Sequence, residues 1–365
     1  MGNPFLSNPQ PDFPELDRTV RGLDKPSRAH VIEIGIDHPF LQQLQERYLD
    51  EPWIPLTDDT VEAYYRQIAW LWYRLGYECL TLFISHLNMP ARQMRVSPDT
   101  KTLPLGQKDR HWAEEGQGVI TSWADFDAYP WDEIVPDHRQ LEAFRKGLPP
   151  GCKMTVMPTV FTQVQVSLLG SEGLFYLLHD DPDLVAAVFE RWGQIIYDLY
   201  AEVIDMEEIG ALWHADDLGF TTSTLIAPDD IRKLAMPWYV KFGELAHAHD
   251  KGFWLHCCGN VYATGIIEDL IEDAKLDAFH SFQDPILPVN GFVDQYGERI
   301  AALGGVDMDK LCRLGEEPLR QYMRDILDHC VPRGRFVFGS GNTVTNYTPM
   351  DHYCWLLEEA RSWRP

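Results

Sequence analysis

The feature of this sequence that most constrains its fold is a regular alternation of short apolar runs with longer amphipathic stretches. Short apolar runs separated by helix-length segments are typical of parallel strands joined by crossover helices. Eight such units favour a closed (β/α)8 barrel of the TIM type over an open sheet. The runs cover residues 29–36, 78–84, 152–159, 210–219, 252–260, 277–282, 299–307 and 335–342.

The chain is long for a single domain, but barrels of this type often extend to such lengths as one unit. We therefore expect residues 29–365 to form a single catalytic barrel domain. Residues 1–28 are polar and rich in proline, and we expect them to form an irregular N-terminal arm. The long interval 85–151 follows the second run. It is expected to form an elaborated loop that lines the pocket or contacts a second copy, or else a small subdomain.

Helix signals between the runs support this interpretation. The stretch 181–203 has the apolar spacing of an amphipathic helix. The stretch 227–252 places Pro228 in a first turn, where proline is tolerated, and Gly252 at its end. Pro237 lies inside this second stretch and predicts a kink or a break there.

Charge and cysteine content restrict the function and the location. The 365 residues carry a net charge of −25, which disfavours binding to nucleic acid or to anionic membranes. The N-terminal residues lack a signal-peptide pattern, and no apolar run approaches the roughly 18 residues of a membrane span. The 7 cysteines are irregularly spaced and predict a reducing cytoplasm, with no disulfide framework.

Polar residues gather at the carboxyl ends of the predicted strands. In a barrel these ends surround one mouth, so side chains from distant parts of the sequence converge there. The sequence therefore predicts an active site at this rim. Its members are Glu33, His214, Asp216, Asp217, His256, Cys258, His280, Asp307, Ser340 and Asn342.

The strongest local signal is the pair His256 and Cys258 in the segment LHCCGN. Side chains alternate along a strand, so these two should face the same side and Cys257 the other. An imidazole and a thiolate placed in this way can share one Zn²⁺ ion. The alternative is a buried cysteine that packs as a small apolar residue beside a hydrogen-bonded histidine.

Three further residues are candidates for catalysis. Asp216 and Asp217 are adjacent carboxylates that could bind a metal, orient a substrate or act as a general acid. They could also simply cap the loop that precedes Gly219. His280 could contact a substrate or a metal, although a hydrogen-bonded core histidine fits the sequence equally well.

The segment from about residue 170 to 358 resembles the uroporphyrinogen decarboxylase superfamily. The motifs that carry the resemblance are HADDLGFTTSTLIAPDDIRKLAMPWY, HAHDKGFWLHCCGNV, DAFHSFQDPILPV, YGERIAALGGVDMD and FGSGNTVTNYTPMDHY. True decarboxylases of this superfamily carry an arginine-containing N-terminal signature similar to RQAGRYLPEY. Arg18, Arg21 and Arg28 precede the first strand but lack that pattern, so decarboxylation of a porphyrinogen is not expected.

The resemblance instead points to the branch of methyltransferases that work with corrinoid proteins. Its zinc-containing members carry His-x-Cys on one strand and a distant cysteine near the last strand. His256 and Cys258 match the first pair, but Ser340 stands near the position of the distant cysteine. The resemblance thus implies zinc, with a binuclear or absent metal left open, and it leaves the third ligand open among Glu33, Asp216 or Asp217, His280 and Ser340.

The resemblance implies transfer of a methyl group from a small donor to the cobalt of a corrinoid (cobalamin) carried by a partner protein. We expect O-demethylation of a methoxylated aromatic, because a ligand set that lacks the distant cysteine suits an oxygen substrate slightly better than a thiol. Glu33, His214, Asn342 and Tyr347 are the expected substrate contacts, and a homodimer is left open. The aromatic residues that are candidates for lining the substrate pocket are Trp123, Trp131, Trp213, Phe282 and Tyr347.

Two other functions remain open at this point. The first is a metal-free decarboxylase or lyase for a small carboxylated substrate, which would need arginines inside the mouth. Its candidates are Arg74, Arg232, Arg299 and Arg335. The second is a barrel without catalytic activity that carries a corrinoid or another tetrapyrrole.

Overall fold

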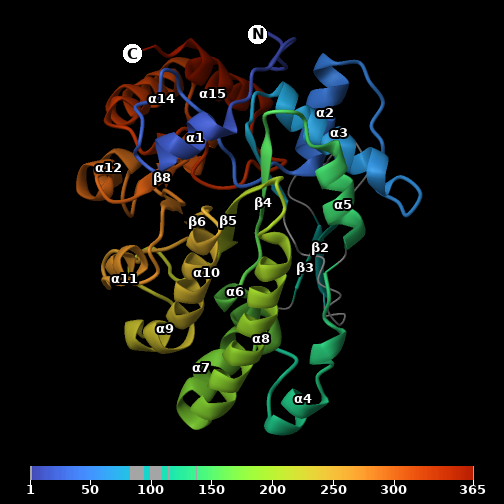
Figure 1. Cartoon of the computed structure of the whole chain (residues 1–365), viewed down its shortest axis with the longest axis vertical. Coiled ribbons are helices and arrows are strands. Elements are labelled where there is room, and N and C mark those ends of the chain that lie inside the picture. Colours follow the sequence, from blue (N-terminus) through green and yellow to red (C-terminus); the bar gives the residue numbers. More distant parts are fainter. Residues whose placement is uncertain (1, 83–93, 99–108, 114–115, 137, 365) are drawn as a thin grey trace.

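A curled parallel sheet surrounded by helices dominates the computed structural model, which describes residues 2–82, 94–98, 109–113, 116–136 and 138–364 (Figure 1). Seven of the eight predicted runs contain a strand, and neighbours in the sheet follow the order of the sequence. The strands are β1 (Cys79–Leu82), β4 (Lys153–Val156), β5 (Ile209–Ala215), β6 (Gly252–His256), β7 (Ala278–His280), β8 (Ala301–Leu303) and β9 (Phe336–Val337).

The remaining run, residues 29–36, is extended but does not form a regular strand. It lies parallel to the chain after β9 through isolated bridges, Val31 to Phe338 and Ile36 to Val344. Towards β1, the hydroxyl of Thr81 donates to the carbonyl of Glu33 (3.4 Å), and no backbone ladder joins the two among the described residues. The sheet therefore has seven strands, with this segment beside its last strand.

The packing inside the sheet is that of a sheet curled around its own interior, which is consistent with the predicted barrel. One buried cluster takes side chains from all seven strands or their ends and from the 29–36 segment, including Ile32, Trp213 and Trp254. A second, larger cluster lies between the strands and the surrounding helices. Two concentric apolar shells are what a sheet curved around its own interior produces.

The N-terminal arm is not irregular throughout, so this prediction was wrong for residues 13–20. They form α1 (Phe13–Val20), whose cap Asp12 accepts the N–H of Glu15 (3.0 Å). Phe13, Leu16 and Val20 belong to the inner cluster of the sheet. The apolar spacing of three and four residues in FPELDRTV was the available signal.

The surrounding helices agree with the sequence patterns. The stretch 181–203 forms α8 (Pro182–Val203), and the stretch 227–252 breaks at Pro237 into α9 (Pro228–Leu234) and α10 (Met236–Ala248). Asp250, not Gly252, adopts the left-handed conformation after α10 (φ 54°). The other helices of the barrel layer are α2 (His38–Tyr48), α3 (Val61–Arg74), α11 (Ile266–Glu272), α12 (Val289–Tyr296), α13 (Met308–Arg313), α14 (Glu316–Cys330), η3 (Val331–Arg333) and α15 (Met350–Ser362).

The interval between β1 and β4 is elaborated, as the sequence predicts. Its β2 (Met94–Pro98) and β3 (Asp109–Ala113) form a separate antiparallel pair. The interval continues with α4 (Trp123–Ala128), η1 (Trp131–Glu133) and α5 (His138–Gly147), and α5 packs on α3. After β4 come α6 (Phe161–Gln163), the π-helix η2 (Val164–Leu168) and α7 (Ser171–Asp180). None of the described helices combines the length and the apolar character needed to cross a bilayer.

Candidate functional site

Three potential metal ligands meet where β5 and β6 end. Asp217 follows β5, His256 is the last residue of β6, and Cys258 lies two residues beyond. The Nε2 atom of His256 is 3.6 Å from the Cys258 sulfur and 3.6 Å from Oδ1 of Asp217. Ligand atoms on a tetrahedral zinc ion are about 3.3–3.8 Å apart, given bonds of about 2.0–2.3 Å. One oxygen, one nitrogen and one sulfur donor thus fit Zn²⁺, and we call these three residues the triad.

Strand alternation explains the orientation of the triad residues. Trp254 of β6 belongs to the inner cluster, and His256 follows on the same side of the strand. Cys257 lies in the outer cluster, fully buried, where burial raises the pKa of its thiol. The predicted division between Cys257 and Cys258 is therefore present in the structure.

The electrostatics of the triad favour a bound positive charge. Burial opposes ionisation of Asp217, but His256 and the backbone N–H of Cys258 (3.0 Å) outweigh it and lower the pKa of the carboxyl to about 2. Burial also opposes a charged His256, but Asp217 and Cys258 raise the pKa of its imidazole to about 9. A site that holds an extra proton in this way is one where a metal cation can take the place of the proton.

Two residues that follow other strands, β7 and β9, contact the sulfur of Cys258. The Asn342 side-chain amide donates to it at 3.1 Å, and the hydroxyl of Ser281 lies 3.4 Å away. Asn342 was among the predicted site residues, whereas Ser281 was not. Its position directly after His280, at the end of β7, was the signal that could have identified it.

His280 lies behind the triad. Its Nδ1 atom is 2.7 Å from Nδ1 of His256, and its Nε2 atom is 3.1 Å from the carbonyl oxygen of Ser340. Burial, together with the charge on His256, holds the pKa of His280 well below its usual range. Both ring nitrogens are therefore engaged within the protein.

Asp216 and His214 face away from the triad. The Asp216 carboxylate accepts the N–H groups of residues 160–162 (2.8–3.1 Å) and the hydroxyl of Tyr239 (2.8 Å). His214 is fully buried and contacts the same carboxylate through Nε2 (2.9 Å). Strand alternation accounts for this, because Trp213 of β5 faces the inner cluster and residues 214 and 216 therefore face the outer helices.

The other predicted site residues lie outside the triad. Glu33 is fully buried, accepts the backbone N–H of Ser340 (3.1 Å) and contacts the Ser340 hydroxyl. That hydroxyl also contacts the carbonyl of Asn342, so it does not point to the metal ligands. Tyr347 is half exposed in the loop before α15, and no described hydrogen bond joins it to the triad. Among the residues left open as third ligand, Asp217 is therefore the one that the geometry favours.

The buried carboxyl of Glu33 should make folding stability depend on pH. Burial raises its pKa from 4.5 to about 8, so the folded protein holds the proton more tightly than the unfolded chain. Its contribution to stability is therefore complete below pH 4.5 and is lost as the pH rises towards 8. A glutamine at this position cannot ionise. We therefore expect the free energy of unfolding of Glu33→Gln, relative to that of the wild type, to increase by up to about 1.4 kcal/mol per pH unit across this window. Urea unfolding at several pH values measures the difference, and a constant difference would contradict the expectation.

Gly219 and Gly259 lie in the two loops that carry the triad residues, and their small size lets the backbones of these loops touch. Gly259 has φ +101°, and a Cβ atom there would lie 2.1 Å from the carbonyl carbon of Gly219. We expect Gly259→Ala to lower the free energy of unfolding by about 1–3 kcal/mol and to weaken metal binding at the neighbouring Cys258. Unfolding and zinc titrations should both show the loss. Gly173→Ala, where a Cβ would meet nothing within 4 Å, is the control.

A cavity of about 240 Å³ lies beside the triad. Its walls include the apolar residues Phe282, Ile286 and Met308 and the polar residues Thr221, Gln283, Asp307 and Asp309. It reaches the triad through Asn342, which also contacts the Cys258 sulfur. A cavity lined by both apolar and polar side chains, next to a candidate metal centre, is suited to a small organic ligand.

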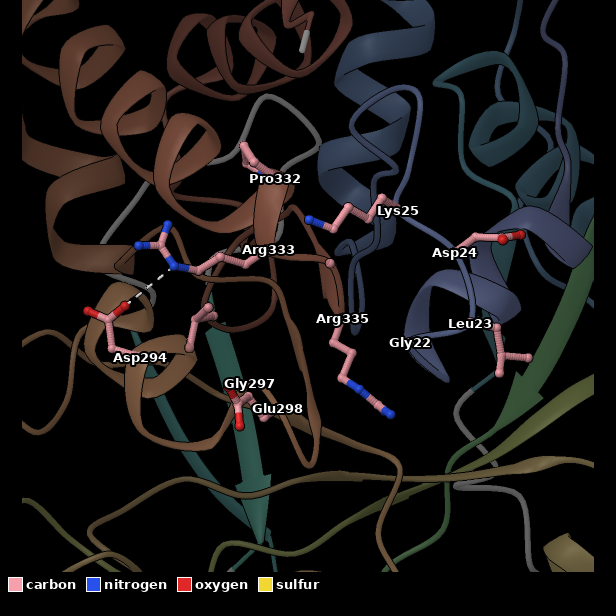
Figure 2. Close-up of a pocket in the computed structure, with 12 residues that line it drawn as sticks. Gly22, Leu23, Asp24, Lys25, Asp294, Gly297, Glu298, Pro332, Arg333 and Arg335 are labelled. Carbon is pink, nitrogen blue, oxygen red and sulfur yellow. Dashed lines mark ion pairs between the residues drawn. The ribbon is translucent and has the colours of Figure 1, made fainter.

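A larger cavity, of about 750 Å³, lies at the other end of the strands, before β8 and β9 begin. Figure 2 shows its charged lining, in which Arg333 turns to Asp294 (Nε to Oδ1, 3.6 Å) and Arg335 enters from another wall. Active sites of barrels of this kind lie at the carboxyl ends of the strands. The position of this cavity therefore argues against a catalytic role.

Comparison with known proteins agrees with the fold. The family model "Uroporphyrinogen decarboxylase (URO-D)" matches residues 161–363. A solved methyltransferase from Methanosarcina mazei has a TM-score of 0.67 at 13% identity, over 96% of this chain and 98% of the other. A sugar phosphate isomerase/epimerase from Parabacteroides distasonis has a TM-score of 0.41 at 13% identity, over 89% and 96% of the two chains. No curated protein matches the sequence significantly.

Proposed function

The chain belongs to the uroporphyrinogen decarboxylase family, and from this premise we propose that it is a methyltransferase. It would move a methyl group from a small donor to the cobalt of a corrinoid held by a partner protein, with a zinc ion assisting the leaving group. The observation that carries the proposal is the convergence of Asp217, His256 and Cys258 at the carboxyl ends of β5 and β6. The fold shared with a solved methyltransferase supports it.

The triad supplies three protein ligands and leaves one position of a tetrahedral ion for the substrate. A zinc ion bound there would polarise the oxygen of a methyl ether and make it a better leaving group. The chain's own contribution is to hold the ligands in place. Asn342 and Ser281 orient the Cys258 sulfur, and the Cys258 backbone N–H orients Asp217.

The ligand set and the neighbouring cavity support an O-methylated aromatic as the donor. A carboxylate in place of a second thiolate makes the ligand set harder, which suits an oxygen atom better than a sulfur atom. The cavity beside the triad offers Phe282, Ile286 and Met308 to an aromatic ring and the amide of Gln283 to a ring substituent. The other proposed aromatic walls lie elsewhere: Trp213 is in the inner cluster, and Trp123 and Trp131 pack around Phe126 in the insertion after β1.

The alternative, a lyase for a carboxylated substrate, receives less support from the described residues. It would need cationic side chains at the mouth, and the four arginines proposed for this role lie elsewhere. Arg74 donates to the Leu6 carbonyl, Arg232 pairs with Asp229 and Asp269, Arg299 pairs with Glu268 and Glu272, and Arg335 lines the cavity at the opposite end.

The proposed partner and compartment follow from charge and from the cysteines. A net charge of −25 would speed association with a corrinoid protein whose docking face is basic. The 7 cysteines are all unpaired, as expected for a protein that works in the reducing cytoplasm.

A direct experiment tests the proposal. Purified protein is analysed for zinc, then incubated with a reduced corrinoid protein and a panel of methoxylated aromatics while the absorption of methylcobalt is recorded. Methylation that depends on zinc, on the donor and on the corrinoid protein is the expected result. Decarboxylation of an aromatic acid by metal-free protein would favour the lyase instead.

A further inference from the structure

A chain of three polar groups leads from the triad into the wall of the barrel. Nδ1 of His256 faces Nδ1 of His280 at 2.7 Å, and Nε2 of His280 faces the carbonyl oxygen of Ser340 at 3.1 Å. His280 is completely buried and His256 nearly so. This series of hydrogen-bonded groups connects the ends of β6 and β7 with the segment after β9.

The Ser340 carbonyl determines where the protons lie in this chain. A carbonyl oxygen can only accept a hydrogen bond, so Nε2 of His280 must carry a proton. Nδ1 of a neutral His280 is then an acceptor, and the proton between the two rings belongs to Nδ1 of His256. The ring nitrogen of His256 that remains for a metal is Nε2, which faces Asp217 and Cys258.

The surroundings of His280 keep its ring in this orientation. Trp213 meets it edge to face, with centroids 5.7 Å apart and planes at 81°. On another side is Gly304, at φ +85°, where a Cβ atom would lie 2.9 Å from Nε2 and Cδ2 of the ring. Glycine is thus required at position 304 for the ring to stay close to the Ser340 carbonyl.

We propose that His280 is a positioning residue that keeps a proton on Nδ1 of His256 and fixes the orientation of its ring, so that Nε2 is the nitrogen directed at the metal position. It is not itself a ligand, because both of its nitrogens are taken up by His256 and Ser340. Partners of this kind raise the affinity of metal sites by orienting the ligand. The inference rests on the metal-binding part of the proposed function.

Two substitutions test it through metal affinity. Gln at position 280 keeps one acceptor and one donor, whereas Leu has a similar size and keeps neither. We expect His280→Leu to weaken Zn²⁺ binding by about 10–100-fold and His280→Gln to restore most of the loss. His214→Leu is the matched control, since it removes a fully buried strand histidine that faces away from the triad. Equal zinc affinity in the His280→Leu protein and the wild type would overturn the proposal.

A second readout separates this inference from the proposed function. In metal-free protein labelled with ¹⁵N-histidine, the hydrogen-bonded proton on Nδ1 of His256 should give a slowly exchanging, downfield NMR signal. We expect the signal in the wild type and in His280→Gln, and its loss in His280→Leu. Wild-type protein that shows the signal but binds no zinc would contradict the proposed metal site and leave the histidine pair confirmed. Absence of the signal from the wild type would contradict the pairing itself.

Discussion

Replacing Cys258 with alanine is expected to abolish tight zinc binding, whereas the same change at Cys257 is expected to preserve it. Cys258 supplies the sulfur of the triad and lies 3.6 Å from Nε2 of His256. Cys257 is buried in the outer cluster on the opposite side of the chain. Loss of one of three protein ligands should lower the affinity by at least about 100-fold, more than the loss of a residue that only orients a ligand.

The adjacent cysteine makes this comparison internally controlled. Both variants lose one thiol from neighbouring positions, and Cys257→Ala should cost more stability because its side chain is fully packed. Elemental analysis and competition with a chromogenic chelator measure the affinity, and His256→Ala should behave as Cys258→Ala does. Retention of stoichiometric zinc in the Cys258→Ala protein would remove Cys258 from the site.

The two adjacent aspartates are expected to show opposite effects when each is replaced by alanine. The Asp216 carboxylate accepts three backbone N–H groups from residues 160–162, and Tyr239 and His214 contact it as well. Removing it would leave several buried donors without a partner, and we expect a loss of about 3–5 kcal/mol in the free energy of unfolding. Zinc affinity of the molecules that remain folded should change little.

Asp217→Ala should instead impair the metal site. Half of the Asp217 side chain is exposed, so its removal should cost less stability than removal of the fully buried Asp216. The triad, however, loses its oxygen donor. Urea unfolding and zinc titration of both variants measure the two effects together. If Asp216→Ala lost zinc while Asp217→Ala kept it, the assignment of the third ligand would be reversed.

Several properties of this protein could be derived from local sequence patterns. The alternation of runs and helices predicted seven of the strands, and Pro237 predicted the break between α9 and α10. Alternation along a strand predicted that His256 and Cys258 share one side. These features depend only on backbone geometry within one element, so a few neighbouring residues suffice to specify them.

Which of Asp216 and Asp217 faces the interior of the sheet could be predicted in part without the tertiary structure. The same alternation, applied along β5 from Trp213, places residue 217 inside and residue 216 outside. In the sequence the two aspartates remain equivalent candidates until this alternation is applied to the run 210–219. The identity of the outer partners of Asp216, which are residues 160–162 and Tyr239, could not be read from that period.

The sequence by itself determined the α/β class of the fold, seven strands of its parallel sheet and the strand ends where chemistry is expected. Only the tertiary structure decided which polar side chains meet: Asp217 joins His256 and Cys258, Ser340 turns its hydroxyl to Glu33, and His280 bridges His256 to a backbone carbonyl. The physical reason is that such contacts join residues far apart in the chain. They depend on how strands are staggered and how each backbone turns after its strand, and no local period encodes either.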